Sequence, residues 1–596
     1  MKALRHLNKY LYKYRIRLGL GILFIILSNF FSTVQGPVIR EVIDYLTSSY
    51  QVLGKITDPT AKADFSHEFM TKIAGYGITI LVMALVSGVF LYFQRQTIIG
   101  MSRYVEFDLK NEIYAHYQSL PLAFYRKNNT GDLMNRISED VSQVRMYLGP
   151  SIMYFINLLA LFFITITIMF SVDVKLSFYV LIPLPILTLS IYLVHNTMDK
   201  RSDEVQKGLS KMSTYVQEAF SGIRVLKAFV REKDSYEKFV EESNTYKDKS
   251  LKLASINAFF FPLIVALTGL SVIIIVYYGG KEVIAGNITY GNITEFIFYL
   301  NKLTWPVASL GWTTSLVQRA EVSQRRINEF LNTKTDIISN KNLDVEIKGH
   351  IVFDKVSFIY PESGIEALRE VSFEIKAGES VAIVGGTGSG KSTIANLVGR
   401  LYDVTDGRIL VDGNDIKDFN INSLRNQVGY VPQDVFLFSD TIKNNIAFGS
   451  ENLSNDDMLQ ASKDADLYDN IKGFPLGFET ILGERGITLS GGQKQRLSIA
   501  RAIARNPRIL ILDDCLSAVD TKTENAILNN LQGIMQDKTT LIISHRVSSV
   551  KLANKIMVLE NGIIAEEGTH DVLMARNGIY KDLYTKQLME EKVGLS

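Results

Sequence analysis

Residues 381–393 read VAIVGGTGSGKST, and this stretch decides the fold of the second half of the chain. Its last nine residues, 385–393, fit the pattern GxxxxGK[ST]. A short β-branched run, 381–384, precedes them, and apolar residues at helical spacing follow. Glycines allow successive backbone N–H groups to converge on phosphate oxygens, and the start of a helix adds positive potential. The stretch therefore predicts a strand, a phosphate-binding loop and a helix in succession, and not a bare glycine-rich turn.

The side chains of this loop predict a nucleotide site that uses Mg²⁺. Lys391 can reach the β- and γ-phosphates, and Ser392 can ligate the metal ion. The residues expected to bind the nucleotide are Gly385, Gly386, Thr387, Gly388, Ser389, Gly390, Lys391, Ser392 and Thr393.

Two neighbouring carboxylates follow a second buried-strand pattern, ILILD at 509–513. At the end of a strand beside the phosphate loop, Asp513 can hold the Mg²⁺ shell. Asp514 comes next, and it can orient a water molecule for attack. The alternative for Asp514 is that it caps the N-terminus of the following helix.

The pentapeptide LSGGQ at 489–493 precedes a helical run, 494–503. It is a second glycine-based helix start, and such a start also suits an anion. Because the chain has one phosphate loop and two such helix starts, the second one suggests a role at the nucleotide of another subunit.

The rest of the second half indicates an α/β domain. Short β-branched runs at 351–353, 409–411 and 539–543 alternate with helical patterns. Asn561-Gly562, between two apolar runs, predicts a β-hairpin. With 64 basic and 62 acidic residues the net charge is +2, which gives no electrostatic reason to expect nucleic acid as a ligand.

The first half of the chain has long segments without charge. A bilayer core of about 30 Å needs about 20 helical residues. Five segments meet this length, and a sixth contains Lys302 and Pro306, yet we count it as spanning too. The six expected spans are 18–39, 73–94, 146–172, 176–198, 253–280 and 296–318.

The first 17 residues carry six Lys or Arg and no acid, with leucines at helical spacing. This predicts a basic amphipathic helix on the inner membrane face, and the positive-inside rule then places the N-terminus in the cytosol. Six spans return the chain to the cytosol. The long charged segments 95–145 and 199–252 are expected to continue membrane helices into the cytosol.

Together, the phosphate (Walker A) loop, LSGGQ and the strand ending at Asp513 resemble the ATP-binding-cassette (ABC) transporters. Six spans before one cassette are similar to the bacterial half-transporters that export lipids and drugs, a family that includes the lipid A flippase. The resemblance implies an all-α six-helix transmembrane domain followed by an α/β P-loop nucleotide-binding domain. The expected boundaries are 1–330 for the membrane domain with its coupling helices, 331–345 for a linker, 346–585 for the cassette and 586–596 for a tail.

The resemblance also assigns roles to single residues. Tyr360 matches the aromatic residue that stacks on adenine, and Gln433 matches the glutamine that contacts Mg²⁺ and the attacking water. His545 matches the histidine at the γ-phosphate, Asp520 belongs to the D-loop, and 483–486 match a motif before LSGGQ. The signature residues expected to act on the partner's ATP are Leu489, Ser490, Gly491, Gly492 and Gln493. The segments 121–132 and 215–225 resemble the two coupling segments.

One residue departs from the family pattern. Asp514 stands where the family usually has Glu, and its side chain is one methylene shorter. The expected catalytic residues are Asp514, His545 and Gln433, and the expected metal ligands are Ser392, Gln433 and Asp513. In the family such a replacement marks the weak site of heterodimeric exporters, so the sequence predicts an ATP hydrolase of low intrinsic rate.

The function expected from the resemblance is ATP-driven export or flipping of a lipid, drug or other amphiphile, with ATP and Mg²⁺ as cofactors. The partners expected are a second half-transporter, identical or different, and the lipid bilayer of a bacterial inner membrane. The alternatives are an ABC importer and an ATP-gated channel or regulatory subunit.

Two single residues carry further expectations. Cys515 is expected to be a small buried side chain. Lys302 either extends to the outer face or meets an anionic headgroup in a cavity.

Overall fold

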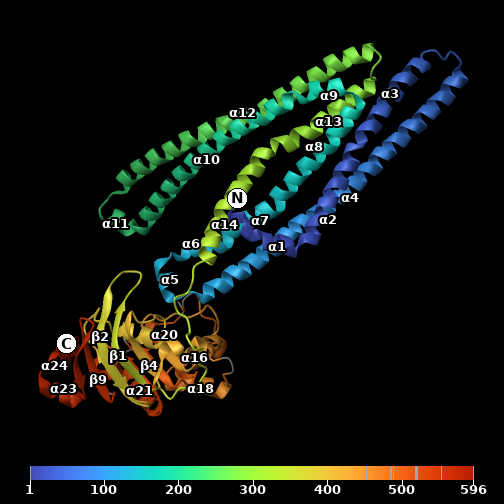
Figure 1. Cartoon of the computed structure of the whole chain (residues 1–596). Helices are drawn as coiled ribbons and strands as arrows, with labels where there is room; N and C mark the ends of the chain where they lie inside the picture. The colour runs from blue at the N-terminus through green and yellow to red at the C-terminus, as the bar shows by residue number, and fades with distance from the viewer. Residues whose placement is uncertain are drawn as a thin grey trace. The chain divides into compact units, whose positions relative to one another are not determined.

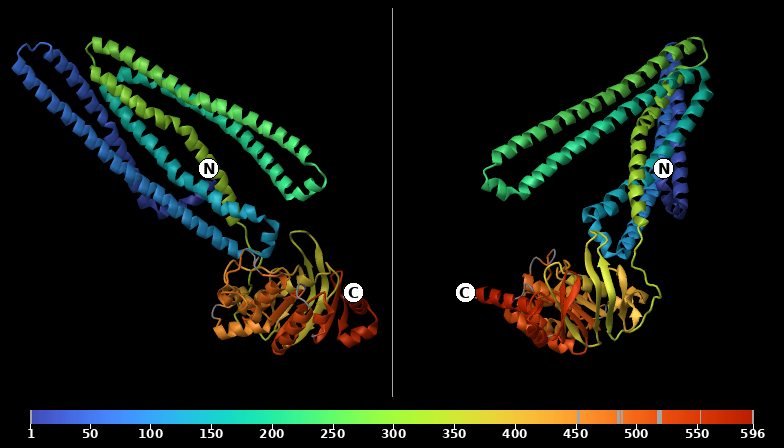
Figure 2. Two further views of the ribbon diagram at one scale, coloured as in Figure 1. Left: turned by 180° about the vertical axis from the view of Figure 1, so that it is seen from behind. Right: turned by 60° about the vertical axis from the view of Figure 1, so that its left-hand side comes forward.

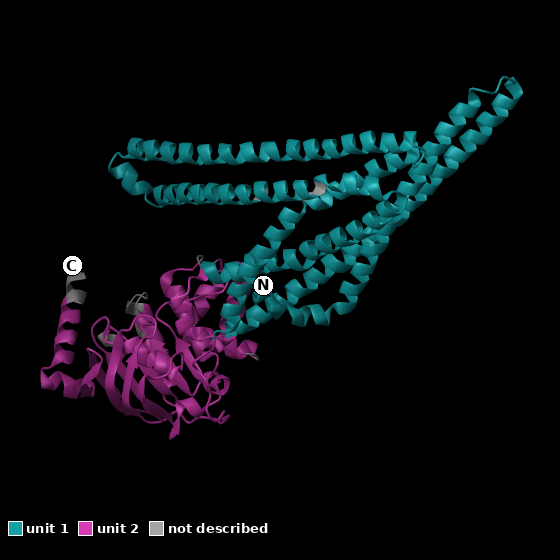
Figure 3. Cartoon of the chain, turned by 45° about the horizontal axis from the view of Figure 1, so that its top comes forward, with its two compact units in different colours: residues 1–118, 131–333 teal, residues 119–130, 334–596 magenta. Residues whose placement is uncertain are grey.

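The computed structural model describes residues 2–450, 453–483, 486, 489–516, 521–551 and 553–594. The chain forms two compact units (Figure 3). Unit 1 contains residues 1–118 and 131–333, and unit 2 contains residues 119–130 and 334–596. The short segment 119–130 thus leaves the helices of unit 1 and belongs by its contacts to unit 2.

Unit 1 is helical throughout its regular structure, and several of its helices are much longer than a bilayer requires (Figure 1). Its elements are η1 (Ala3–Leu7), α1 (Asn8–Lys13), α2 (Arg15–Thr33), α3 (Gln35–Leu53), α4 (Pro59–Ser119), α6 (Thr130–Asn135), η2 (Arg136–Asp140), α7 (Val141–Met146), η3 (Tyr147–Ser151), α8 (Ile152–Val172), α9 (Val174–Leu181), α10 (Pro183–Ser221), α11 (Ile223–Ala228), α12 (Glu232–Ile284), α13 (Tyr290–Ala308) and α14 (Leu310–Leu331).

Five helical stretches among the described residues are long and apolar enough to cross a membrane. They are Arg15–Leu53, Pro59–Ser119, Thr130–Val172, Val174–Ser221 and Glu232–Ile284. Each contains one of the first five segments expected from the sequence. The sixth segment falls on α13 and α14, which meet at Ser309 just after Pro306. Lys302 and the charges of α14 make it less apolar, and its crossing stays a prediction.

The helices of unit 1 pack through close approaches at glycine. α10 and α12 run side by side, as both views in Figure 2 show. α3 packs on α13, where a Cβ at Gly36 would lie 2.4 Å from the Tyr299 hydroxyl. α2 approaches α4 in the same way, since a Cβ at Gly21 of α2 would lie 2.3 Å from Ile98 of α4. Small residues at such crossings are typical of helices that associate in lipid.

The basic N-terminal segment is helical, as the sequence predicts, but its apolar face packs on the protein. Leu4, Leu7 and Tyr10 are buried. Lys9 lies 2.6 Å from Glu112 and Lys13 lies 2.6 Å from Asp108, both acids of α4. These contacts anchor η1 and α1 to the long helix α4, so only part of the positive charge remains available for lipid headgroups.

Unit 2 contains two sheets and confirms the α/β prediction. The four-stranded sheet has the order β2-β1-β4-β5 and is antiparallel, and the six-stranded sheet has the order β10-β9-β3-β8-β7-β6. The strands are β1 (Ile351–Ile359), β2 (Glu366–Ile375), β3 (Ser380–Val384), β4 (Asp406–Val411), β5 (Asn414–Asp415), β6 (Val428–Val431), β7 (Ile509–Asp513), β8 (Thr539–Ile543), β9 (Lys555–Glu560) and β10 (Ile563–Gly568).

The central strands of the larger sheet are parallel, and only β10 runs antiparallel to its neighbour. β3, β7 and β8 are buried along their whole length, because one face of the sheet shares a core with the smaller sheet and α15, and the other face packs on helices. The helices of unit 2 are α5 (Leu122–Lys127), α15 (Lys391–Val398), η4 (Ile416–Asp418), α16 (Ile421–Asn426), α17 (Ile442–Ala447), α18 (Asn455–Asp464), α19 (Tyr468–Lys472), η5 (Gly477–Glu479), α20 (Gly491–Ile503), α21 (Thr521–Met535), α22 (Val547–Val550), α23 (His570–Arg576) and α24 (Ile579–Gly594).

The predicted hairpin is present between β9 and β10. Asn561 and Gly562 join the strands with φ angles of 52° and 80°. Positive φ at both central residues is the requirement of a type I′ turn, which Asn-Gly meets best.

Candidate active site

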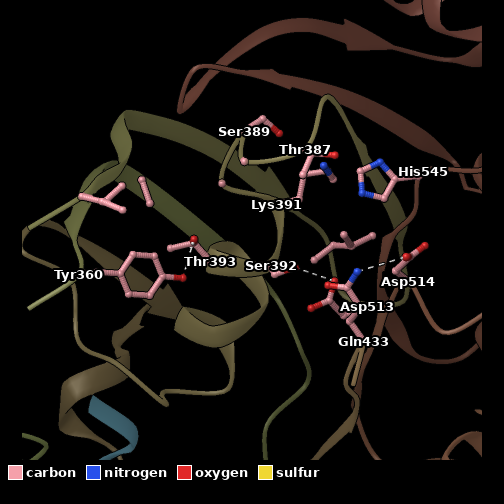
Figure 4. Close-up of a pocket in the computed structure, with 15 residues that line it drawn as sticks. Tyr360, Thr387, Ser389, Lys391, Ser392, Thr393, Gln433, Asp513, Asp514 and His545 are labelled. Carbon is pink, nitrogen blue, oxygen red and sulfur yellow. Dashed lines mark hydrogen bonds between the residues drawn. The ribbon is translucent and has the colours of Figure 1, made fainter. Parts of the chain in front are cut away.

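A cavity of 310 Å³ opens at the carboxyl ends of the parallel strands (Figure 4). Its lining comprises Tyr360, Ile365, Ala367, Thr387, Gly388, Ser389, Gly390, Lys391, Ser392, Thr393, Gln433, Asp513, Asp514, Ile543 and His545. The register explains why these distant residues meet, since Ile543 of β8 lies opposite both Ile383 of β3 and Asp513 of β7. The loops that follow these strand ends therefore converge, as in other open α/β sheets.

The loop after β3 needs glycine at two positions. Gly385 and Gly390 have φ angles of 156° and 102°. A Cβ would lie 2.1 Å from the Leu559 carbonyl oxygen at Gly385, and 2.4 Å from the Ala367 carbonyl oxygen at Gly390. The backbone at Leu559 and Ala367 therefore packs closely against the loop. This packing holds the N–H groups of the loop in position to bind an anion.

Lys391 lies inside this loop. Its Nζ donates hydrogen bonds to the carbonyl oxygens of Gly385 at 2.9 Å and Gly386 at 2.7 Å. The side chain is buried, and burial lowers the pKa of Lys391, while the carboxylates of Asp514 and Asp513 act in the opposite direction. A phosphate group in the cavity would supply the negative charge that favours the ammonium form.

Ser392 and Asp513 form the expected metal-binding pair. The Ser392 hydroxyl donates to Asp513 Oδ1 at 3.0 Å. Burial of the Asp513 carboxyl raises its pKa, and the charge of Asp514 adds to this effect. Mg²⁺ is usually held by one or two carboxylates together with substrate phosphates, and seldom by an all-protein cage. One hydroxyl and one buried carboxylate beside a phosphate loop fit this donor set, and the described residues contain no larger cluster of His, Cys, Asp and Glu.

Asp514 lies at the same strand end but has a different environment. Gln433 Nε2 donates to Asp514 Oδ2 at 3.5 Å, and the Asp514 N–H donates to the Ile543 carbonyl at 2.7 Å. Its φ of 45° lies in the left-handed region, which Asp tolerates better than most residues. The two residues after Asp514, 515 and 516, form a turn and not the start of a helix, so the alternative that Asp514 is a helix N-cap is wrong.

His545 faces the cavity near Lys391 and Asp514 (Figure 4). Burial lowers the pKa of His545 below its usual 6.5, the charge of Lys391 lowers it further, and Asp514 opposes both. The imidazole is therefore neutral near pH 7, and one ring nitrogen remains available as a hydrogen-bond donor. The side chain of Gln587, on the C-terminal helix α24, donates to the His545 carbonyl oxygen and was not expected from the sequence.

Tyr360 lies at the other end of the cavity (Figure 4). Its hydroxyl is hydrogen-bonded to Thr393 Oγ1 at 2.9 Å. Its ring meets Phe358 and Tyr402 edge to face, with centroid distances of 4.8 and 5.5 Å. These contacts hold an aromatic ring beside the phosphate loop, where a nucleobase can stack on it.

The segment 119–130 packs directly beside this tyrosine. Leu122 and Ala123 of α5 contact the apolar core of unit 2. The Arg126 guanidinium lies 5.7 Å from the Tyr360 ring centroid and 5.9 Å from that of Tyr402. The sequence predicted a coupling segment here, but it did not predict the position of this segment beside Tyr360, the residue expected to stack on adenine.

A glutamate completes the contact between α5 and the tyrosines. Glu362 lies 3.6 Å from Arg126 and accepts a hydrogen bond from the Tyr402 hydroxyl at 2.9 Å. Glu362 and Tyr402 carry no motif, and only the tertiary structure brings them to Arg126.

The signature pentapeptide has the local structure expected of a helix start. Ser490 caps α20, its hydroxyl accepts from the Gln493 N–H at 3.3 Å, and Gln493 Oε1 accepts from the Ser490 N–H at 3.0 Å. No residue of 489–493 lines the cavity of the same chain. The D-loop residue Asp520 and the residues Glu484 and Arg485 of the motif before the signature lie outside the described residues.

Comparison with known proteins matches the first and second halves of the chain to two families. Residues 18–307 match the family described as "ABC transporter transmembrane region", and residues 368–517 match the family described as "ABC transporter". The chain is 37% identical over 541 residues to a probable multidrug resistance ABC transporter ATP-binding/permease protein, YheI, of Bacillus subtilis, covering 90% of this chain and 92% of that protein. The chain is an ABC transporter.

Two further matches describe the same kind of protein. The ATP-dependent lipid A-core flippase of Syntrophus aciditrophicus is 36% identical over 87% of this ABC transporter and 86% of its own length. The solved structure of a bacterial Atm1-family ABC exporter with ATP bound superposes with a TM-score of 0.77 at 26% identity, covering 96% of this chain and 99% of that one. The ABC transporter thus shares the full architecture of exporters, with a membrane region followed by a cassette, and the predicted fold class is confirmed.

Substitution of Tyr360 tests the nucleobase end of the cavity. Tyr360→Ala should weaken ATP binding about tenfold or more, because stacking of a base on an aromatic ring contributes about 1–3 kcal/mol. Tyr360→Phe removes only the hydroxyl bonded to Thr393 and should stay within about threefold of wild type. Titration with a fluorescent ATP analogue measures both affinities. Equal weakening by the two variants would contradict a stacking role.

Proposed function

We propose that this chain is one half of a dimeric ABC exporter that uses ATP to move an amphiphile from the cytosolic side of the membrane outward. The main support for the proposal is the position of α5. The helix α5 joins the long helix α4 to the helical stretch Thr130–Val172, which begins with α6, and it packs next to the tyrosine of the ATP cavity. A change at the nucleotide therefore has a short physical route to helices that are long enough to cross a bilayer.

The chain's own residues account for how ATP is held. Backbone N–H groups of 386–391 and the Lys391 ammonium bind the phosphates, and Tyr360 stacks on the adenine. Ser392, Gln433 and Asp513 would hold Mg²⁺, which when bound neutralises charge on the β- and γ-phosphates. His545 donates a hydrogen bond to the γ-phosphate, and Asp514 with Gln433 orients the attacking water.

The signature acts on the ATP of the partner subunit. No residue of 489–493 lines the cavity of its own chain, and the capped start of α20 presents N–H groups suited to an anion. Only a closed pair of cassettes makes both sets of phosphate contacts. ATP thus shifts the population toward the closed pair by its greater affinity for that state.

The orientation follows from six crossings. A sixth crossing by α13 and α14 returns the chain to the side on which it began, so the basic N-terminal segment and the cassette are both cytosolic. A bacterial inner membrane is the location that this arrangement and the bacterial relatives support. α5 and α11 are then the cytosolic ends of the α4–α6 and α10–α12 hairpins.

The rate of hydrolysis at this chain's own site is low. Asp514 is one methylene shorter than Glu, and a misplacement of about 1 Å in a catalytic group can cost roughly 100-fold in rate. The partner is either a second copy or a different half-transporter. Its signature would complete the site that Lys391 and Asp514 form here.

Reconstitution tests the export proposal. Proteoliposomes that hold the chain, or the chain with its co-purifying mate, should move a fluorescent amphiphile out of the cytosol-facing leaflet only when Mg-ATP is present. Lys391→Ala proteoliposomes are the control for transport without ATP use. ATP-dependent conductance without vectorial movement would indicate a channel, and movement toward the cytosolic side would indicate an importer. Either result contradicts the proposal.

A further inference from the structure

The peptide group of His545 is held by a side chain from the C-terminal end of the chain. His545 follows strand β8, and its imidazole faces the cavity (Figure 4). The side-chain amide of Gln587, 42 residues further along on α24, donates to the His545 carbonyl oxygen. Because a peptide group is planar, a donor that fixes this oxygen also fixes the ψ angle of His545. Gln587 can therefore set the direction of the imidazole, although it is not part of the cavity lining.

The helix that carries Gln587 is fixed to the larger sheet at its first turn. Glu566 of β10 accepts from the N–H groups of Ile579 at 2.8 Å and Tyr580 at 3.1 Å. A carboxylate at a helix start satisfies donors that have no partner within the helix, and it interacts favourably with the helix dipole. The Tyr580 hydroxyl is also hydrogen-bonded to His570 Nδ1 of α23 at 2.8 Å. The start of α24 thus has a fixed position relative to the strands.

One side of α24 faces the segment that follows His545. Tyr584 and Gln587 are three residues apart and share this side of the helix. The Tyr584 hydroxyl accepts from Lys551 Nζ at 3.1 Å, and Gln587 donates to His545. α24 therefore contacts both ends of residues 545–551, with Gln587 at the end that lies in the cavity.

A buried glutamate of α21 holds the same segment through other atoms. Glu524 is buried and pairs with the guanidinium of Arg546. The Ser549 hydroxyl donates to Glu524 Oε1 at 3.3 Å. These contacts fix the side chains that follow His545, whereas the bond from Gln587 acts on the peptide group of His545 itself. Loss of Gln587 should therefore release one specific degree of freedom, the orientation of that peptide, and leave the segment in place.

We infer that Gln587 is a positioning residue for ATP hydrolysis, and that α24 holds His545 in the orientation in which its imidazole meets the γ-phosphate. The inference rests on the role of His545 in the proposed function, and it adds a residue that belongs to no motif of the chain. Gln587 acts only through His545 and makes no contact with the nucleotide. A misplacement of about 1 Å in a catalytic group can cost roughly 100-fold in rate, so a device that fixes one peptide plane has a measurable effect.

The test measures how strongly the full-length chain prefers a nucleotide that has a γ-phosphate. AMP-PNP has this group and is not hydrolysed, whereas ADP lacks it. Each competes, in the presence of Mg²⁺, with a fluorescent ATP analogue on the chain in nanodiscs. The ratio of the two affinities reports on contacts to the γ-phosphate. A change that only loosened the fold would weaken both nucleotides alike and leave the ratio unchanged.

Gln587→Met keeps the length of the side chain but removes its donor. It should lower the preference for AMP-PNP over ADP about three- to fivefold, the effect of one hydrogen bond, with the affinity for ADP unchanged. Gln587→Lys retains a donor and should restore most of the preference. Gln532→Met, the same change at an exposed glutamine of α21, is the matched control and should keep the wild-type ratio. Full preference in Gln587→Met, or an equal loss in Gln587→Lys, overturns the inference.

A second comparison keeps the test decisive if Gln587→Met destabilises the fold. Gln587→Glu places an acceptor against the His545 carbonyl and should also lower the ratio. In the His545→Ala background no imidazole remains to be positioned, so Gln587→Glu should cause no further loss. An additional loss in the double variant would show that Gln587 acts on the γ-phosphate by another route, which contradicts the inference.

His545→Ala by itself separates this inference from the proposed function. It should lower the preference for AMP-PNP about tenfold, as expected for a hydrogen bond to a charged group. If it does so while both Gln587 variants keep the wild-type ratio, the positioning role is wrong and the role of His545 stands. If His545→Ala keeps the full preference, His545 does not contact the γ-phosphate, and both that part of the proposed function and the inference are wrong.

Discussion

Lys391→Ala should lower ATP affinity and turnover by about 100-fold or more. The Lys391 ammonium is buried in the loop with its hydrogen bonds directed to Gly385 and Gly386, so it is held where phosphate oxygens enter. Hydrogen bonds to charged groups contribute about 1.5–3 kcal/mol each, and two of them to phosphate oxygens together account for about two orders of magnitude. Equilibrium binding of a fluorescent ATP analogue and phosphate release measure the two losses.

The matched control is Lys376→Ala, which removes an exposed lysine that precedes the same strand, β3. It should leave both quantities unchanged. Lys391→Arg keeps the charge but replaces a compact ammonium with a planar guanidinium, and it should recover only part of the binding because the two groups place their donors differently. Turnover within a few-fold of wild type in Lys391→Ala would show that this cavity is not the hydrolytic site.

Asp514→Glu should raise ATP turnover by the chain alone, by roughly tenfold to 100-fold. The Asp514 carboxylate lies 3.5 Å from Gln433 Nε2, and Asp514 lines the 310 Å³ cavity. The longer side chain brings its carboxylate toward the γ-phosphate end, where a correctly placed base is worth about this factor. Steady-state phosphate release from the purified chain measures the change.

Two further substitutions identify the cause of any change. Asp514→Ala removes the carboxylate and should lower turnover below wild type, whereas Asp513→Glu disturbs the adjacent metal-binding position and should not raise it. ATP affinity should change little in Asp514→Glu, since the residue acts on the water and not on the nucleotide. If wild type already hydrolyses ATP as fast as Asp514→Glu, the proposal of a weak site is wrong.

The contact of α5 with Tyr360 bears on how ATP binding could act on the membrane helices. Arg126 lies over the rings of Tyr360 and Tyr402, and Glu362 links it to Tyr402. Adenine stacked on Tyr360, as proposed above, would therefore meet a ring that already contacts Arg126 of α5. We expect the base, and not only the γ-phosphate, to act on α5, which joins α4 to α6 along the chain.

Local sequence signals predicted those features that depend on neighbouring residues. The Asn561-Gly562 turn needs positive φ at two adjacent positions, and few other dipeptides supply it. The strand 539–543 was predicted with its observed bounds. A short run of β-branched and apolar residues is typical of a parallel strand that is buried on both faces. Motif spacing similarly predicted the loop around Lys391.

The structure decided between alternatives that the sequence left open for Asp514, Cys515 and Lys302. The turn at residues 515 and 516 excluded the role of Asp514 as a helix N-cap. The buried position of Cys515 confirmed that it is a core residue, and burial raises the pKa of its thiol to about 12, which leaves it unreactive. Lys302 was found against Ser32 of α2 and not at the outer face.

The amino-acid sequence by itself determined the membrane-helical half, the α/β half and the glycine-rich loop of the cavity, because hydropathy, periodicity and glycine-rich loops act over a few neighbouring residues. Only the tertiary structure decided that Arg126, Glu362 and Tyr402 meet beside Tyr360, and that Lys302 has no carboxylate partner among the residues that the structure describes. Such contacts depend on how the backbone folds over hundreds of residues, and no local pattern of side chains encodes them.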